Sequence, residues 1–401
     1  MHDGPHFQES IRCLFGLSRY YNLSLLMRYL NPTGALNRFE RIDFSRIVTL
    51  LLLPLILAGL PIAGVVYQAI GSWIDDRRFP PPGVVVDIGQ CRLHLKRQGC
   101  GQPVVVLESG IAATSISWSP LQARLAQICT VCSYDRAGLG WSERRRDGKC
   151  LRTLEQMAGE LESLLRNGKL APPFVLVGHS FGGLLVSAFA HIHPERVAGL
   201  VLVDPVSLAY WASGSQTSAD QIFAAARLSR RGAVLARIGL VRIALSVLNA
   251  GGRWFPRYVG RAAARQGSGA MQNLAAQVAK LPSELRSTVR AHWSRPKGFF
   301  AMAEYLESLP ACAAAGLKMR VPASIPVTIL SAGNATIEEL RERDEWAGQS
   351  ERGCHLKVPG TGHWLQLEKP ELIAGVVREM VNQWKDSLRQ NQSGRVPDES
   401  C

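Results

Sequence analysis

Ser180 stands in the stretch VLVGHSFGG, residues 175–183, with a glycine two residues before it and another two residues after it. A serine hydroxyl is a weak nucleophile by itself. It attacks a carbonyl when a base takes its proton and an acid orients that base. A chain with 37 glycines can produce this spacing by chance, so the surrounding sequence must show whether Ser180 is placed for chemistry.

The residues around Ser180 predict a sharp turn between a strand and a helix. Pro172 and Pro173 precede the apolar run FVLV, and the chain after the serine has apolar residues at helical spacing, at Leu184, Leu185, Ala188 and Phe189. A nucleophile on such a turn has a strained backbone and needs neighbours without side chains, because the strand and the helix approach closely there. Gly178 and Gly182 meet this requirement.

The base that Ser180 requires is sought among nine histidines. His363 lies in GTGHW, a glycine-bearing loop between the last strand-like run, CHLKV, and a helix-like stretch, PELIAGVVREMVNQW. That loop is expected at the edge of the sheet where the strands end. Other histidines have structural interpretations, on the helix behind the serine, within strands or in the N-terminal leader: His191, His193, His94, His355, His2 and His6.

Short β-rich runs alternate with helix-like stretches beyond residue 83. The runs are VVVDIG, RLHLK, PVVVLESG, VCSYD, FVLVGHS, GLVLVDP, PVTILSAG and CHLKVPG. Several are continuously apolar over four to six residues, which is typical of strands buried on both faces of a parallel sheet. This order predicts an α/β fold with a mainly parallel central sheet flanked by helices.

Five collinear stretches make the chain resemble the α/β-hydrolase superfamily over residues 84–388. They are LESG, SYDRAGLGWSE, VLVGHSFGG, GLVLVDP and PGTGHWLQLEKPE. The resemblance implies that Ser180 is the nucleophile and His363 the general base. It also implies an oxyanion hole made by the backbone N–H groups of Phe181 and Ile111. Many members begin that loop with His-Gly. Here the residues are Ser109 and Gly110, so only the glycine and the backbone role carry over.

The acid of the triad departs from the commonest pattern of the superfamily. Members often place an aspartate after the seventh strand, where this chain has Asn334. Others place a carboxylate after the sixth strand, and Asp204 in LVLVDP occupies that position. We expect Asp204 to be the acid, with carboxylates beyond strand seven as the alternative: Glu338, Glu339 and Asp344. Asp135 is interpreted as structural, holding its loop through hydrogen bonds or Arg136.

Residues 47–67, IVTLLLLPLILAGLPIAGVVY, carry no charged side chain. A 21-residue helix matches a bilayer core of about 30 Å, so the sequence predicts a transmembrane helix over residues 47–70. A cleavable signal peptide and a buried core helix are the alternatives. Six arginines precede the segment, which places the leader, residues 1–46, in the cytosol and the catalytic part across the membrane. Residues 71–83 have the charge, proline and glycine of a linker.

Residues 205–320 form an insertion between the core segments 84–204 and 321–388, and the resemblance implies a helical cap there. The insertion carries 16 Lys and Arg against four acids, a net charge of +12 within a total of +14. Arginines alternate with aromatic residues in GGRWFPRYVGR, which suits an anionic membrane surface. A solvated cap surface is the alternative, and nucleic acid is not expected outside the cytosol.

The sequence therefore predicts a membrane-tethered serine hydrolase that cleaves a carboxylic ester, with a small molecule or a lipid as substrate, and without a metal or organic cofactor. Hydrolysis of amides, thioesters or C–C bonds and acyl transfer stay open, since the fold supports all of them. A ligand-binding or sensing protein without turnover is the alternative from another class. Aspartate-nucleophile chemistry of the usual kind is not expected, because residue 180 is serine. The polar tail, residues 389–401, and the oligomeric state carry no prediction.

Overall fold

The computed structural model describes the backbone of residues 44–146, 151–250 and 280–393 and the side chains of residues 59–146, 151–247 and 280–390. The chain divides into two compact units, Met1–Pro61 and Ile62–Cys401. In the first unit, the described part is the beginning of helix α3 (Phe44–Arg78). Most of the predicted leader and the end of the predicted tail lie outside the described residues.

An eight-stranded sheet forms the centre of the second unit, in the order β1-β2-β4-β3-β5-β6-β7-β8 for the described residues. The strands are β1 (Val84–Asp87), β2 (Arg92–Gln98), β3 (Val104–Glu108), β4 (Val131–Tyr134), β5 (Phe174–His179), β6 (Val197–Val203), β7 (Val327–Ala332) and β8 (Gly353–Val358). Strand β2 pairs antiparallel with β1 and β4, and the remaining pairs are parallel. All eight predicted runs form strands, so the predicted mainly parallel sheet is confirmed.

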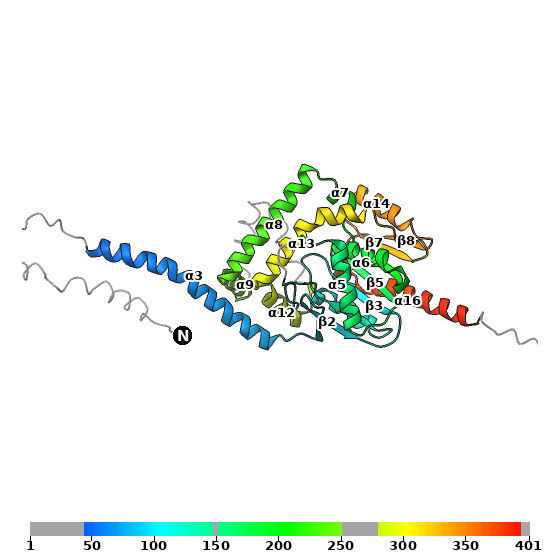
Figure 1. Cartoon of the computed structure of the whole chain (residues 1–401), viewed down its shortest axis with the longest axis horizontal. Helices are drawn as coiled ribbons and strands as arrows, with labels where there is room; N and C mark the ends of the chain where they lie inside the picture. The colour runs from blue at the N-terminus through cyan, green and yellow to red at the C-terminus, as the bar shows by residue number, and fades with distance from the viewer. Residues whose placement is uncertain (1–43, 147–150, 251–279, 394–401) are drawn as a thin grey trace, which may run out of the picture. The chain divides into compact units, whose positions relative to one another are not determined.

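Helices cover both faces of the sheet (Figure 1). Alternate residues of the inner strands pack into two different clusters. Val106 and Leu202 lie with α5 (Leu154–Asn167) and α6 (Phe181–Ile192). Leu107 and Val203 lie with α4 (Ser119–Leu125) and α16 (Pro370–Ser393). Because successive strand side chains point to opposite faces, continuous apolar runs are what a sheet covered on both sides requires.

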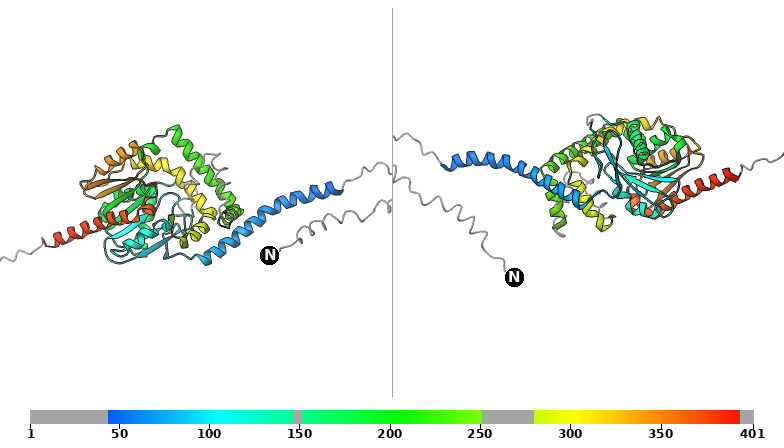
Figure 2. Two further views of the ribbon diagram at one scale, coloured as in Figure 1. Left: turned by 180° about the vertical axis from the view of Figure 1, so that it is seen from behind. Right: turned by 60° about the horizontal axis from the view of Figure 1, so that its bottom comes forward.

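Helices make up most of the described part of the segment between β6 and β7 (Figure 2). The segment contains α7 (Leu208–Ala212), α8 (Gln216–Arg237), α9 (Leu240–Ala250), α12 (Ser283–Trp293) and α13 (Pro296–Gly316). We call this segment the cap. Helix α13 reaches the core, where its buried Tyr305 ring lies 6.2 Å from the ring of Phe181. The predicted aromatic and basic stretch GGRWFPRYVGR lies outside the described residues.

After β7 the chain forms α14 (Ile337–Ala347), then β8, and then the short helix α15 (Leu365–Glu368) that leads into α16. Two 3-10 turns complete the described elements, Ser115–Trp118 before α4 and Pro194–Arg196 before β6. Consequently the loops after β3, β5, β6 and β8 all open at the carboxyl edge of the sheet, which is where ligands bind in open α/β sheets.

Helix α3 differs from its prediction in two respects. It continues to Arg78, so residues 71–78, which were expected in a linker, are helical. A survey of the described residues finds no helix with the length and apolar character needed to cross a bilayer. The side chains of residues 47–58, half of the predicted span of residues 47–70, lie outside what the structure describes.

The second half of α3 packs against the cap. A methyl group added at Gly64 would lie 2.3 Å from the carbonyl oxygen of Ile238, and one at Gly71 would lie 2.7 Å from the Arg242 guanidinium. Arg242 in turn pairs with Asp75 at 2.7 Å. Two glycines and an ion pair therefore bring α3 into close contact with α9 and with the turn that precedes it.

The turn at Ser180 sets a strict limit on residue 182. A methyl group at Gly182 would lie 2.6 Å from the Glu108 carbonyl oxygen and 2.7 Å from that of Ser109, both backbone atoms. We expect Gly182→Ala to lower the free energy of unfolding by about 1–3 kcal/mol. Chemical denaturation monitored by circular dichroism measures this change.

Gly375→Ala is the matched control, since Gly375 lies within α16 and has open space around it. There the added methyl group should raise stability by about 0.5–1 kcal/mol, because alanine favours a helix interior. Equal stabilities of the two variants would contradict the packing described for the turn.

Candidate active site

Ser180 lies on the turn between β5 and α6 with φ of 56° and ψ of −122°, a conformation that L residues rarely adopt. Its N–H donates to the carbonyl of Val203 at 3.0 Å. A methyl group at Gly178 would lie 2.5 Å from the carbonyl oxygen of Gly182. Gly178 is therefore restricted by the approach of β5 and α6, whereas Gly182 is restricted by the backbone of Glu108 and Ser109 at the end of β3.

His363 and Asp204 are brought together from loops 159 residues apart in the sequence. Asp204 directly follows β6, and His363 lies between β8 and α15. His363 Nδ1 lies 2.6 Å from Asp204 Oδ2. The His363 side chain is 47% exposed and that of Asp204 only 8%, so the pair has one buried end and one accessible end. A base oriented in this way has its second nitrogen, Nε2, available for a reacting group.

Asp204 is held by further donors. Its Oδ1 accepts hydrogen bonds from the N–H of Ala332 at 2.9 Å and from Arg343 of α14 at 2.8 Å. Arg343 is also buried and donates to the carbonyl of Pro205 at 2.6 Å. Burial by itself raises the pKa of Asp204, but the hydrogen bond from His363 and the charge of Arg343 outweigh it, and the net pKa is lowered. Asp204 is therefore an anion at neutral pH.

His179, the residue before Ser180, supports His363 from the other side. Its Nε2 lies 2.7 Å from the backbone carbonyl oxygen of His363, and the two rings lie 4.6 Å apart. Burial, with a smaller effect from the charge of His363, lowers the pKa of His179 to about 3. The neutral imidazole thus donates its Nε2–H to that carbonyl.

The backbone N–H groups of Ile111 and Phe181 donate no hydrogen bond within the described part of the chain. The loop of Ile111 lies beside the nucleophile, since a methyl group at Gly110 would be 3.4 Å from Ser180 Cβ. Two unpaired donors near a serine are what stabilisation of an oxyanion requires.

The carboxylates considered as alternative acids have other partners. Glu339 caps the N-terminus of α14 together with Thr336, and Asp344 pairs with His355 at 2.6 Å. Glu338 is exposed in the first turn of α14. Of the candidate acids, Asp204 is the one that the structure brings to His363.

Asp135 accepts hydrogen bonds from His94 at 2.9 Å and from the N–H groups of Ser115 and Trp141. This agrees with its structural interpretation, although Arg136 pairs with Glu108 instead.

No hydrogen bond joins Ser180 to His363 among the described residues. Sequence reasoning also missed Arg343 and His179. His179 carried one usable signal, its position next to the nucleophile, whereas Arg343 carried none because it lies 139 residues from Asp204 in the sequence.

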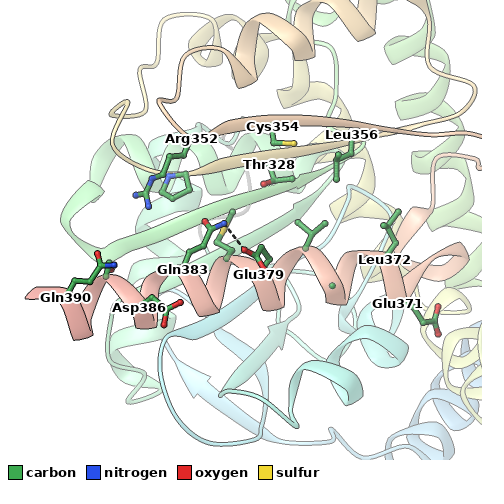
Figure 3. Close-up of a pocket in the computed structure, with 15 residues that line it drawn as sticks. Thr328, Arg352, Cys354, Leu356, Glu371, Leu372, Glu379, Gln383, Asp386 and Gln390 are labelled. Atoms are coloured by element: carbon green, nitrogen blue, oxygen red, sulfur yellow. Dashed lines mark hydrogen bonds between the residues drawn. The ribbon is translucent and has the colours of Figure 1, made fainter.

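Two cavities are relevant to the candidate site: a large groove away from Ser180 and a small cavity beside the loop after β3. An open groove of about 890 Å³ runs between α16 and the first residues of β7 and β8 (Figure 3), and Ser180, Asp204 and His363 do not line it. A cavity of about 70 Å³ lies between the loop after β3, at Ala112 and Thr114, and cap residues that include His292 and Phe299. The cap and the core together enclose space next to the loop after β3, which carries Ile111.

Known proteins are similar to this chain in sequence and in fold. Residues 103–370 match the family model described as the alpha/beta hydrolase fold. A 2-hydroxymuconate semialdehyde hydrolase of Pseudomonas putida is 37% identical over 123 residues, 30% of this chain and 42% of that protein. An AB hydrolase superfamily protein of Gibberella zeae is 37% identical over 109 residues, 26% of this chain and 32% of that protein. The aligned stretch spans less than half of the length of such curated relatives.

Solved structures with the same fold include an esterase from Thermogutta terrifontis, with a TM-score of 0.51 and 22% identity over 75% of this chain and 98% of that one. A haloalkane dehalogenase variant from Bradyrhizobium elkanii has a TM-score of 0.52 and 17% identity over 77% of this chain and 98% of that one. Since the family model covers more than half of the 401 residues, the chain belongs to the α/β-hydrolase fold family.

Proposed function

We propose that the protein is a serine hydrolase that cleaves a carboxylic ester through an acyl-enzyme. The observation that carries this proposal is the hydrogen bond of 2.6 Å between His363 and the buried anion Asp204, beside the strained turn of Ser180. A serine, an oriented imidazole and two free backbone donors are the parts that acyl transfer needs.

In the proposed reaction, Ser180 Oγ attacks the ester carbonyl while His363 Nε2 takes the hydroxyl proton. The resulting oxyanion accepts hydrogen bonds from the N–H groups of Phe181 and Ile111. His363 then gives its proton to the leaving alcohol, and the acyl group stays on Ser180. A water molecule, deprotonated by the same imidazole, releases the acid and restores the serine.

Asp204 keeps Nδ1 of His363 as the donor, so that Nε2 faces the serine, and its negative charge stabilises the imidazolium that forms. The name of the Thermogutta terrifontis relative, an esterase, favours ester substrates, while that of the Pseudomonas putida relative keeps other hydrolytic reactions in view. A ligand-binding protein without turnover is the competing function, and labelling of the serine separates the two.

We also propose that α3 attaches the protein to a membrane, with the leader in the cytosol. The support is the uncharged sequence of residues 47–67 and the exposed apolar side chains farther along α3, at Ile62, Val66, Ile70, Trp73 and Ile74. The Arg77 guanidinium lies 3.5 Å from the centre of the Trp73 ring. Tryptophan and arginine are both frequent where a helix leaves the lipid. In this proposal the basic cap faces anionic headgroups, and a lipid ester is a suitable substrate.

A fluorophosphonate probe, which reacts with activated serines, tests the catalytic proposal. Labelling of the detergent-solubilised protein should disappear in Ser180→Ala. Asp204→Asn should slow ester hydrolysis by about 10⁴-fold, because the imidazole is then held in the wrong tautomer. Gel fluorescence and initial rates with p-nitrophenyl esters measure the two effects.

Glu338→Gln is the control, since Glu338 is exposed and lies beyond strand seven. It should keep the wild-type rate. A strong loss of hydrolysis rate in Glu338→Gln, with a wild-type rate in Asp204→Asn, would assign the acid to α14 instead. A folded wild type that the probe does not label would favour the ligand-binding function.

Acid unfolding tests the electrostatic arrangement of Asp204. Its folded-state pKa is lowered, so its stabilising contribution is present above the ordinary aspartate pKa of about 3.9 and is lost as pH falls through the folded value. We expect Arg343→Gln to lower stability by about 3 kcal/mol at neutral pH, because it breaks a buried ion pair. The stability of this variant should also fall less steeply with acid than that of the wild type. Urea denaturation at a series of pH values measures both effects.

The matched control for this experiment is Asp220→Asn, which changes an exposed carboxylate on α8. It should leave both the neutral stability and the acid slope as in the wild type. An Arg343→Gln variant with an unchanged acid slope would contradict the role given to Arg343.

Extraction with alkaline carbonate tests the membrane proposal in the full chain. The wild type should stay with the membranes. Leu53→Arg combined with Leu57→Arg should release it, because each arginine costs about 2.5–3.5 kcal/mol at the centre of a membrane helix. Ile337→Arg, at an exposed position on α14, is the control and should stay bound. Release of the wild type itself would refute insertion.

A further inference from the structure

Arg136 is a buried cation next to the loop that carries Ile111. It follows β4, is 4% exposed, and forms an ion pair with the equally buried Glu108 at the end of β3. Its Nη1 donates to the carbonyl of Ser109 at 2.5 Å, and its Nη2 donates to the carbonyl of Gly110 at 2.6 Å. One guanidinium therefore holds two successive carbonyl groups.

The direction of the Gly110 carbonyl decides the direction of the Ile111 N–H. The two groups belong to one planar trans peptide, in which C=O and N–H point to opposite sides. The carbonyl of Gly110 faces Arg136, and the N–H of Ala113 donates to the same oxygen at 3.2 Å. The Ile111 N–H consequently points away from Arg136, on a loop whose Gly110 borders Ser180.

Arg136 also contacts the residue that supplies the second oxyanion donor. Its guanidinium carbon lies 5.4 Å from the centre of the Phe181 ring and 4.7 Å from that of Tyr305 in the cap. The loop after β3, the first residue of α6 and the cap helix α13 thus meet at one cation. The sequence suggested only a contact between this arginine and Asp135. In the structure Arg136 pairs with Glu108 instead.

We propose that Arg136 is a positioning residue for the oxyanion hole. It fixes the peptide between Gly110 and Ile111 and the ring of Phe181, so that the two N–H groups converge on the same oxyanion. Arg136 does not touch the substrate. This inference rests on the proposed function, because an oxyanion arises only if Ser180 attacks a carbonyl.

The guanidinium is needed for its shape as well as its charge. Arginine presents several donors in a planar fork, whereas lysine carries one compact ammonium group on a flexible stem. Lysine can keep the charge opposite Glu108, but it does not hold two carbonyls and a carboxylate in the same fixed geometry. Arg136→Lys therefore tests positioning, and Arg136→Met removes both charge and donors.

The chain offers a matched control in Arg152. It is 5% exposed, stacks on the same Tyr305 ring at 4.8 Å and pairs with the buried Glu160, but it does not contact the loop of residues 109–111. Loss of Arg152 therefore measures how much activity falls when a buried arginine beside Tyr305 is removed. The difference between the Arg136 and Arg152 variants isolates the effect on the loop of residues 109–111.

The experiment measures kcat and KM with a p-nitrophenyl ester, together with the inhibition constant of a trifluoromethyl ketone, whose serine adduct carries an oxyanion. Arg136→Met should lower kcat by about 10²-fold, the effect of losing one oxyanion donor, with KM within a few-fold of the wild type. Affinity for the ketone should fall by the same factor. Arg136→Lys should lose about 10-fold in both, less than the loss of a whole donor, because lysine keeps the charge but not the planar fork. Arg152→Met should change kcat and ketone affinity by less than about threefold, because it leaves the N–H groups of Ile111 and Phe181 in place.

Equal kcat and ketone affinity in Arg136→Met and Arg152→Met would overturn the inference while leaving the proposed function intact. If Arg136→Met does not fold, Arg136→Lys decides, and a wild-type kcat in that variant would overturn the inference. A folded wild type that neither hydrolyses esters nor reacts with the fluorophosphonate would overturn the proposed function and this inference together.

Discussion

The close approach of β5 and α6 at Ser180 is the constraint on which the rest of the site depends. With φ of 56°, Ser180 sits where L residues are strained, and Gly178 and Gly182 leave no space for a side chain on either side. The pairing of β5 within the sheet and the packing of α6 on one of its faces supply the stability that keeps this conformation. The turn places the Ser180 hydroxyl at the edge of the sheet where the loops of Asp204 and His363 also lie.

Buried charge is arranged around this turn in two separate groups. One group is Asp204 with His363 and Arg343, and the other is Glu108 with Arg136. Each buried anion has a cation and further donors, which a charge removed from water requires. His179 lies between them without a charge, since burial lowers its pKa to about 3. A neutral ring there places no positive charge beside His363.

Much of the fold could be predicted because its signals are local. Eight β-rich runs and the glycines around Ser180 lie within short stretches, and each run forms a strand. Arg343 and Arg136 could not be assigned, because their partners are backbone carbonyls and carboxylates that only the tertiary structure brings near. The end of α3 was missed for a similar reason. DDRR suggested a linker, but Asp75 and Asp76 pair with the cap residues Arg242 and Arg295.

The contact of α3 with α9 links the position of the cap to the binding of whatever holds α3. Gly64 and Gly71 pack α3 against the cap, so a force or a binding event that acts on α3 reaches the cap directly. Thermodynamic reciprocity then requires the converse: any substrate that changes the preferred position of α9 must change the free energy of whatever holds α3, by the same amount. The cap and this helix should therefore be treated as one coupled element.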